Sequence, residues 1–133
     1  MTDYFDLSLD RQTILQMSEL ALAHVGDAVF ELMVRSALSL HGAATNKSLH
    51  KKTVAQVTAS SQAAFVDRIL PVLTEEETAV YKRGRNAHSH AAPKSATPGQ
   101  YARATGLETL FGWLWLTGQK ERLNELFTVG NAL

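Results

Sequence analysis

The sequence predicts an all-α protein, a bundle of about six or seven helices folded as a single domain over residues 1–133. Three observations favour this fold class. Apolar residues recur at helical spacing along most of the chain, and no segment alternates convincingly between polar and apolar residues as a half-buried strand would. Helix-breaking residues are few, with three prolines and eight glycines. The length is also sufficient to bury a sizeable core without disulfides or a structural metal.

The N-terminal half is expected to contain three helices. The first is long and runs from Ser18, a suitable N-cap, to about Leu40, where the sequence HGAAT ends it. Its apolar positions follow the helical period at Leu22, Val25, Val29, Leu32, Met33, Ala37 and Leu40. Asn46 can cap a short helix through KSLHKKT, and Thr58 can open another that Pro71 stops.

A further helix, EEETAVYKRGRN, begins at a capping box formed by Thr74 and Glu77. Three consecutive glutamates in its first turn also suit the positive end of the helix dipole. The next segment, residues 87–99, is small, polar and proline-bearing, which indicates a loop of about a dozen residues. Loops of that length in compact domains are often functional or mobile.

Two helices complete the chain. Thr97 and Pro98 suit the cap and the first position of a helix through QYARATGLETLFGWLWL that ends at Gly118. The last helix, QKERLNELFTV, is amphipathic and is expected to end at Gly130.

The composition indicates a soluble globular protein, with 45% hydrophobic and 20% charged residues. The chain has no cysteine, which excludes disulfides, thiolate metal sites and thiol nucleophiles and fits a reducing compartment. Its N-terminal stretch, MTDYFDLSLDR, begins acidic and does not have the positive start of a signal peptide. No apolar run reaches the length of a membrane span. We therefore expect a cytoplasmic protein with no membrane partner.

The charges are segregated along the chain, although the net charge is zero. Residues 32–66 and residues 78–107 contain basic side chains and no acid. These bases are Arg35, Lys47, Lys51, Lys52, Lys82, Arg83, Arg85, Lys94 and Arg103. Segregated charge predicts a basic face that attracts polyanions, but two solvated basic loops would give the same pattern.

Two carboxylates lie among apolar neighbours, Asp27 in the first long helix and Glu108 in TGLETLFGWLWL. Each has a nearby glycine, Gly26 or Gly106, and a glycine inside a helix usually has a packing reason such as a close helix crossing. If the two helices cross there, the carboxylates converge, and a divalent cation between them removes their repulsion. Oxygen ligands at a phosphate-handling site favour Mg²⁺. The alternative is that each acid pairs with a base or caps a backbone group.

Glu31 lies one turn beyond Asp27 on the same helical face. It is a candidate metal ligand, a candidate acceptor for waters around the metal, or an ion-pair partner for Arg35 one turn further on. His24, one turn before Asp27, is expected to be packed or hydrogen-bonded rather than to bind metal.

Basic and amide side chains gather in two segments, TNKSLHKK and YKRGRNAHSHAAPK. Arginine forks and asparagine amides suit phosphates and the 2′-hydroxyls of an RNA minor groove. Aromatic residues are scarce among them, which favours contact with a duplex backbone over base stacking on single strands. The predicted RNA-binding residues are Asn46, Lys47, His50, Lys51, Arg83, Arg85, Asn86, His88 and Lys94. Acids that hold a hard metal and bases that hold a phosphodiester chain together indicate metal-assisted phosphodiester hydrolysis.

In LALAHVGDAVFEL the chain resembles the ribonuclease III signature helix, with its Gly-Asp-Ala step, and in YARATGLETLFGWLWLTG the later helix of that family. The segments ALAHVGDAVFEL, KRGRNAHSHAAPK and ATGLETLFGWLWLTGQKERLNEL are more similar still to the Mini-ribonuclease III branch, which lacks the double-stranded-RNA-binding domain. The resemblance spans about residues 20–126 and implies the helical fold of a ribonuclease III endonuclease domain.

By this resemblance Asp27 and Glu108 are the catalytic and metal-binding residues. The full-size enzymes have two further site acids, at positions occupied here by Ala23 and Thr105, and the small branch is similar in lacking both. The Thr105 hydroxyl then becomes a candidate contact to the metal or its waters. His24 stands where relatives often have tyrosine.

The resemblance implies a homodimeric endoribonuclease that uses Mg²⁺, with Mn²⁺ as a substitute, to cut double-stranded RNA and leave 5′-phosphate and 3′-hydroxyl ends. In bacteria the branch is associated with maturation of the large-subunit ribosomal RNA precursor. Because Ala23 and Thr105 are not acidic, a non-catalytic RNA-binding or ribosome-assembly protein on the same fold is the alternative. A third reading is an all-α interaction protein whose two acids are structural.

Overall fold

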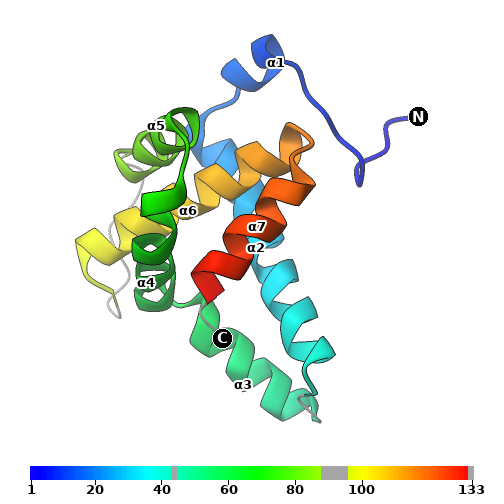
Figure 1. The fold of residues 1–133 in the computed structure, drawn as a ribbon, viewed down its shortest axis with the longest axis vertical. Helices are drawn as coiled ribbons and strands as arrows, with labels where there is room; N and C mark the ends of the chain where they lie inside the picture. Colours follow the sequence, from blue (N-terminus) through cyan, green and yellow to red (C-terminus); the bar gives the residue numbers. More distant parts are fainter. Residues whose placement is uncertain (43–44, 88–95, 132–133) are drawn as a thin grey trace.

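The computed structural model describes residues 1–42, 45–87 and 96–131. Over these ranges the chain forms seven α-helices, one 3₁₀ turn and no strand, so the all-α prediction is confirmed (Figure 1). In order they are α1 (Arg11–Leu15), α2 (Glu19–Leu40), α3 (Asn46–Val57), α4 (Ala59–Ile69), η1 (Leu70–Val72), α5 (Glu75–Arg85), α6 (Pro98–Leu116) and α7 (Lys120–Asn131). No helix in this part of the chain has the length and apolar character of a membrane span.

Most helix starts follow the predicted caps. Ser18 accepts a hydrogen bond from the N–H of Ala21 at 3.1 Å at the start of α2, and Thr58 caps α4. The capping box of α5 is complete, with both reciprocal bonds between Thr74 and Glu77 present. Satisfying these backbone N–H groups fixes where each helix begins.

Three boundaries differ from the predictions. α3 is capped by Thr45 rather than Asn46, because the Thr45 hydroxyl accepts the N–H of Ser48 at 3.0 Å. α1 was not expected, and it is a single turn capped by Asp10. α7 continues through Gly130 instead of ending there. A Cβ at Gly130 would lie 2.3 Å from the Phe65 ring, so this glycine serves packing rather than helix termination.

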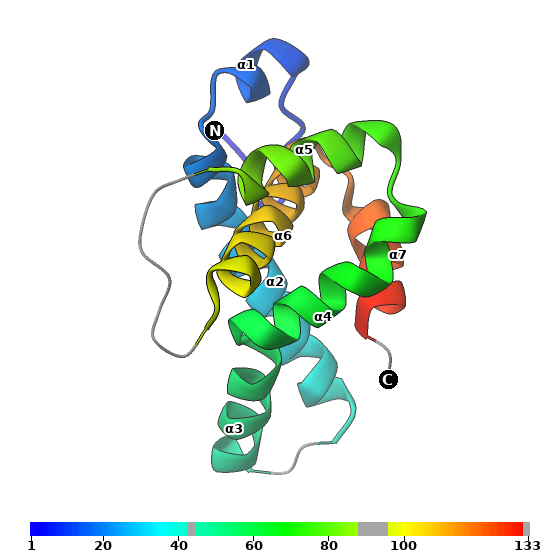
Figure 2. The ribbon, with the colours of Figure 1, turned by 90° about the vertical axis from the view of Figure 1, so that its left-hand side faces the viewer.

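α6 is the central helix of the fold, and its nearly continuous apolar sequence follows from that position. α2 crosses it, and α4, α5 and α7 pack around it (Figures 1 and 2). Leu107, Leu110, Phe111 and Leu114 are fully buried on successive turns of α6. A helix enclosed by neighbours on several sides has apolar residues around most of its circumference, unlike an amphipathic surface helix.

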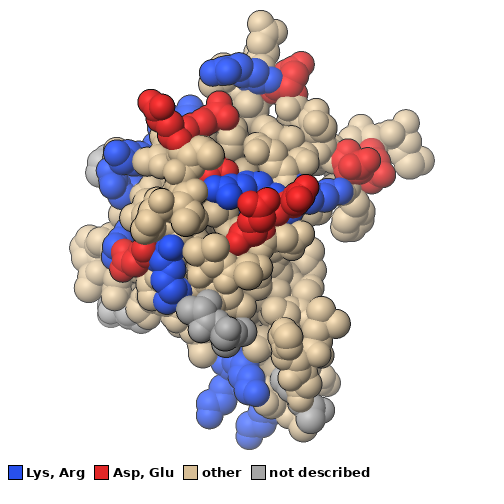
Figure 3. Space-filling model, viewed as in Figure 1, with Lys and Arg blue, Asp and Glu red and all other residues tan. Residues whose placement is uncertain are grey.

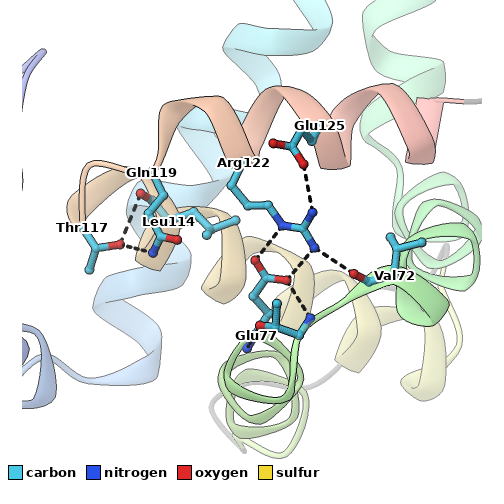
Figure 4. Close-up of polar contacts among 8 residues, drawn as sticks. Val72, Glu77, Leu114, Thr117, Gln119, Arg122 and Glu125 are labelled. Carbon is cyan, nitrogen blue, oxygen red and sulfur yellow. Dashed lines mark hydrogen bonds and ion pairs between the residues drawn. The ribbon is translucent and has the colours of Figure 1, made fainter.

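One buried ion pair connects the C-terminal helix to α5 (Figure 4). The guanidinium of Arg122 on α7 binds both carboxylate oxygens of Glu77, at 2.8 and 2.9 Å, and also donates to the carbonyl of Val72 at 2.8 Å. Burial alone would raise the pKa of Glu77, but the hydrogen bonds and charge of Arg122 and the N–H of Thr74 hold it below its usual value. The predicted capping residue thus has a second role, which is to anchor α7.

Candidate active site

α2 and α6 cross with their backbones in direct contact. A Cβ at Gly26 would lie 1.6 Å from the carbonyl oxygen of Glu108, and a Cβ at Gly112 would lie 1.9 Å from that of Leu22. Only two glycines facing each other permit so close an approach, because any side chain would collide with the opposite backbone. Asp27 directly follows Gly26, so this crossing decides where its carboxylate lies.

The glycine that pairs with Gly26 is therefore Gly112, and not Gly106 as the sequence suggested. Gly106 faces α5, where a Cβ would lie 2.7 Å from the ring of Tyr81 and 2.9 Å from its backbone oxygen. Gly106 and Gly112 of α6 both mark close approaches, but to different helices. Sequence reasoning chose the wrong one because it had no information on which face of α6 meets α2.

The crossing brings the side chains of Asp27 and Glu108 into hydrogen-bonding contact. Asp27 is exposed, whereas Glu108 is half-buried. Burial, the negative charge of Asp27 and this contact raise the pKa of Glu108 to about 8, and a hydrogen bond from Gln62 partly opposes the rise. Two carboxyl groups held together in this way favour a shared proton or a shared cation.

The pair fits a hydrated divalent cation. Across residues 1–42, 45–87 and 96–131, no group of three or more His, Asp or Glu side chains could hold a metal ion. A cation between Asp27 and Glu108 would therefore keep water in most of its coordination positions. Mg²⁺ binds proteins in this manner, through one or two carboxylates and several waters.

The two candidates for contact with the metal waters have other partners. The Glu31 carboxylate accepts the Nε–H of Arg35 at 3.1 Å in an ion pair one turn along α2. The Thr105 hydroxyl is buried and donates to the carbonyl of Tyr101 at 3.0 Å within α6. Ala23, where the larger enzymes of the resembled family have an acid, is also buried.

The structure adds one residue to the site that sequence reasoning missed. Gln62 on α4 is only 3% exposed, and its amide partly opposes the rise in the pKa of Glu108. A signal was present in the sequence, because Gln62 shares the helical period of Phe65, Val66 and Ile69 and so had to face the core. A polar side chain on such a face requires a buried partner.

The predicted RNA-binding residues fall into two groups. Asn46, Lys47, His50 and Lys51 are exposed on α3, whose lysines form the basic group at the lower end of the molecule in Figure 3. Arg83, Arg85 and Asn86 lie at the C-terminal end of α5, where Arg85 donates to Asn86 at 3.2 Å and its guanidinium lies 5.9 Å from the centre of the Tyr81 ring. Along the long axis of the molecule the α2–α6 crossing lies between α3 and α5 (Figures 1 and 2). His88 and Lys94 lie outside the described residues.

Comparison with known proteins identifies the family to which this site belongs. Residues 20–119 match the ribonuclease III domain. A Mini-ribonuclease 3 from Symbiobacterium thermophilum is 46% identical over 112 residues, and one from Enterococcus faecalis is 47% identical over 113 residues. Each alignment covers 84% of this chain and 86% of the relative.

The fold gives a matching result. A crystal structure of a protein from Fusobacterium nucleatum has a TM-score of 0.78 and 31% identity to this chain, covering 87% of this chain and 93% of that one. The family match includes both helices that cross at Asp27 and Glu108. The chain is a member of the ribonuclease III family, an endoribonuclease of its Mini-ribonuclease III branch.

Proposed function

We propose that the protein cleaves double-stranded RNA in a reaction that depends on Mg²⁺, with Mn²⁺ able to substitute. The observation that carries the proposal is the contact between the Asp27 and Glu108 side chains at a glycine-lined helix crossing. Bound there, Mg²⁺ would supply the Lewis acidity for attack of water on phosphorus, leaving 5′-phosphate and 3′-hydroxyl ends.

The role of the two acids follows from their different exposure. Asp27 is exposed and open to a phosphodiester in solvent, whereas Glu108 is half-buried and held by the fold. Glu108 would fix the position of the cation, and Asp27 would complete the pair on the side that faces the RNA. The raised pKa of Glu108 means that cation and proton compete for this carboxylate.

The basic groups on both sides of the crossing support a duplex as the substrate. Lys47 and Lys51 lie one turn apart on α3 and project from an exposed face. Arg83 and Arg85 provide the second group at the end of α5. A duplex backbone that contacts both groups would pass over Asp27 and Glu108, and such binding would weaken steeply with salt.

We further propose that the enzyme is a homodimer. One face of α2 next to Asp27 exposes three apolar residues, Leu20, Ala28 and Leu32, at spacings of eight and four residues. The exposed fractions of Leu20 and Leu32 are 45% and 53%. A symmetric contact along this face would bring two acid pairs onto one surface, which suits the two antiparallel strands of a duplex. By family resemblance, the substrate would be the large-subunit ribosomal RNA precursor in the cytoplasm.

The test is cleavage of a purified RNA duplex in the presence of Mg²⁺. Wild-type protein should cut it, and Asp27→Asn and Glu108→Gln should each lose the activity while keeping the helical CD spectrum. Glu121→Gln, which neutralises an exposed acid on α7, is the matched control and should cut normally. Cleavage that survives either site substitution would refute the assignment. Tight duplex binding without cleavage in either metal would favour the non-catalytic alternative, to which the apolar Ala23 points.

A further inference from the structure

A cleft separates the C-terminal half of α2 from α3, the helix at the lower end of the molecule (Figures 1 and 2). Its volume is about 290 Å³. Two residues of α2 and four of α3 line it, namely Arg35, Ser39, Asn46, Leu49, His50 and Thr53. None of them is an acid or an aromatic residue, so the lining is suited to an anion rather than to a cation or an apolar ligand.

The cleft has a packed floor and polar walls. Thr53 is 5% exposed, and its hydroxyl donates to the carbonyl of Leu49 at 2.8 Å, so these two residues are bonded within α3. The other four lining residues lie at exposed positions and carry N–H or O–H donors. Asn46 is also the first residue of α3, which places the positive end of that helix dipole at the cleft.

Arg35 is held in place by a neighbour on its own helix. Its Nε–H donates to the Glu31 carboxylate at 3.1 Å, which orients the guanidinium from one edge. Across residues 1–42, 45–87 and 96–131, its two Nη groups have no hydrogen-bond partner. An oriented guanidinium with both Nη groups available matches the oxygens of a phosphate.

The cleft lies at a set distance from the acid pair. Asp27, Glu31 and Arg35 follow one another at four-residue intervals on α2, along a line that leads from the helix crossing toward α3. At a rise of 1.5 Å per residue, Arg35 is about 12 Å along the helix axis from Asp27. Because one helix carries both residues, an anion bound by Arg35 would stay at a constant distance from the acids.

We propose that this cleft binds one phosphate of an RNA strand and so fixes the register in which the duplex lies over Asp27 and Glu108, with Arg35 as the main contact. This inference rests on the proposed function of that pair. Phosphate contacts position a protein on a duplex without reading its sequence. A phosphate within a chain is favoured over a free anion, because Lys47 and Lys51 extend the positive charge along α3 beyond the cleft.

The first test is duplex binding, measured by fluorescence anisotropy over a range of salt without divalent metal. Arg35→Met should weaken binding by about 10-fold at low salt and reduce the slope of log affinity against log salt by about 1. The matched control is Arg11→Met, which makes the same change in net charge at an exposed position on α1, at the opposite end of the molecule from α3 (Figure 1). It should bind as the wild type does, and equal affinities of the two variants would overturn the inference.

Arg35→Met also leaves the Glu31 carboxylate without its base, and that charge alone would repel RNA. The comparison is therefore repeated in a Glu31→Gln background, where Arg35→Met should cause the same loss. A loss that disappears there would assign the effect to Glu31 and overturn the inference. His50→Ala tests the α3 wall. It should weaken binding by itself but less so when added to Arg35→Met, because both residues contact one phosphate, and additive losses would contradict a shared contact.

The register is tested by cleavage, in Mg²⁺, of duplexes that carry one neutral methylphosphonate. The wild type should cut poorly at the bond that lies at one fixed offset from the neutral group, and Arg35→Met should cut that bond no worse than its neighbours. An unchanged product pattern in the wild type would overturn the inference while leaving the proposed function in place. Binding that depends on Arg35 without any cleavage by the wild type would instead remove the proposed function and leave the phosphate contact standing.

Discussion

Replacement of Gly26 by alanine should separate α2 from α6 and so disrupt the fold and the acid pair together. The added Cβ would lie 1.6 Å from the carbonyl oxygen of Glu108, and this neighbour is backbone that cannot rotate away. Restoring ordinary van der Waals contact requires the helices to move apart by about 2 Å, and even a gap of 0.5–1 Å forfeits a quarter to a half of the dispersion energy of the atoms involved.

Overpacking of a core typically destabilises a protein by about 1–3 kcal/mol, and a clash between two backbones belongs at or above the upper end. For a domain of this size about 3 kcal/mol corresponds to a fall in Tm of about 10 °C. Gly99→Ala is the matched control, since nothing lies within 4 Å of a Cβ at that position of α6. It should leave stability unchanged or raise it by up to about 1 kcal/mol.

Urea unfolding followed by far-UV CD measures both variants, and Mn²⁺ calorimetry reports the acid pair. Gly26→Ala should be destabilised and should bind Mn²⁺ weakly even at temperatures where it is folded. If Gly26→Ala unfolded at the same urea concentration as Gly99→Ala, the backbone contact at the crossing would be refuted.

Three other predictions concern pH, the ion pair of α7 and the subunit contact. Because the folded pKa of Glu108, about 8, lies above its ordinary value of 4.5, the metal-free fold should lose stability as pH rises from about 5 to about 8, by at most about 5 kcal/mol. Thermal melts in chelator should show this loss, and Glu108→Gln or saturating Mg²⁺ should reduce it. Arg122→Met should destabilise the protein by about 3–5 kcal/mol in urea melts, because it leaves the Glu77 carboxylate buried without its base, and adding Glu77→Gln should recover part of the loss. Leu32→Glu should give a monomer by light scattering, whereas the control Val72→Glu, at a similarly exposed position, should remain a dimer. A dimeric Leu32→Glu would exclude this face of α2 as the contact.

Local signals in the sequence sufficed for most of the helices. Ser18, Thr58 and the Thr74–Glu77 box act on backbone groups within three residues, so their effect does not depend on the rest of the fold. The single turn of α1 was missed because its only buried side chain is Ile14, which gives no periodicity to detect. Thr45 and Asn46 are both good caps, and sequence alone could not choose between them.

The acid pair could be predicted in part because Asp27 and Glu108 are conspicuous among apolar neighbours. The details that depend on which face of each helix meets its neighbour could not be predicted from the sequence. Gly106 and Gly112 look alike in the sequence, and only the packing of α6 assigns one to α5 and the other to α2. Gln62 belongs to a third helix, 46 positions before Glu108 in the chain. Its helical period indicates that it is buried, but no local pattern could show that it acts on the pKa of Glu108.

The central claim is that Asp27 and Glu108 hold one cation between them. The most direct measurement is Mn²⁺ calorimetry without RNA on the wild type, Asp27→Asn, Glu108→Gln and the double variant. The account predicts one saturable site in the wild type and a loss of affinity in each single variant. The double variant should bind Mn²⁺ only slightly more weakly than the single variant with the lower affinity, because the two carboxylates act on the same ion. A single variant that binds Mn²⁺ as tightly as the wild type would contradict the account.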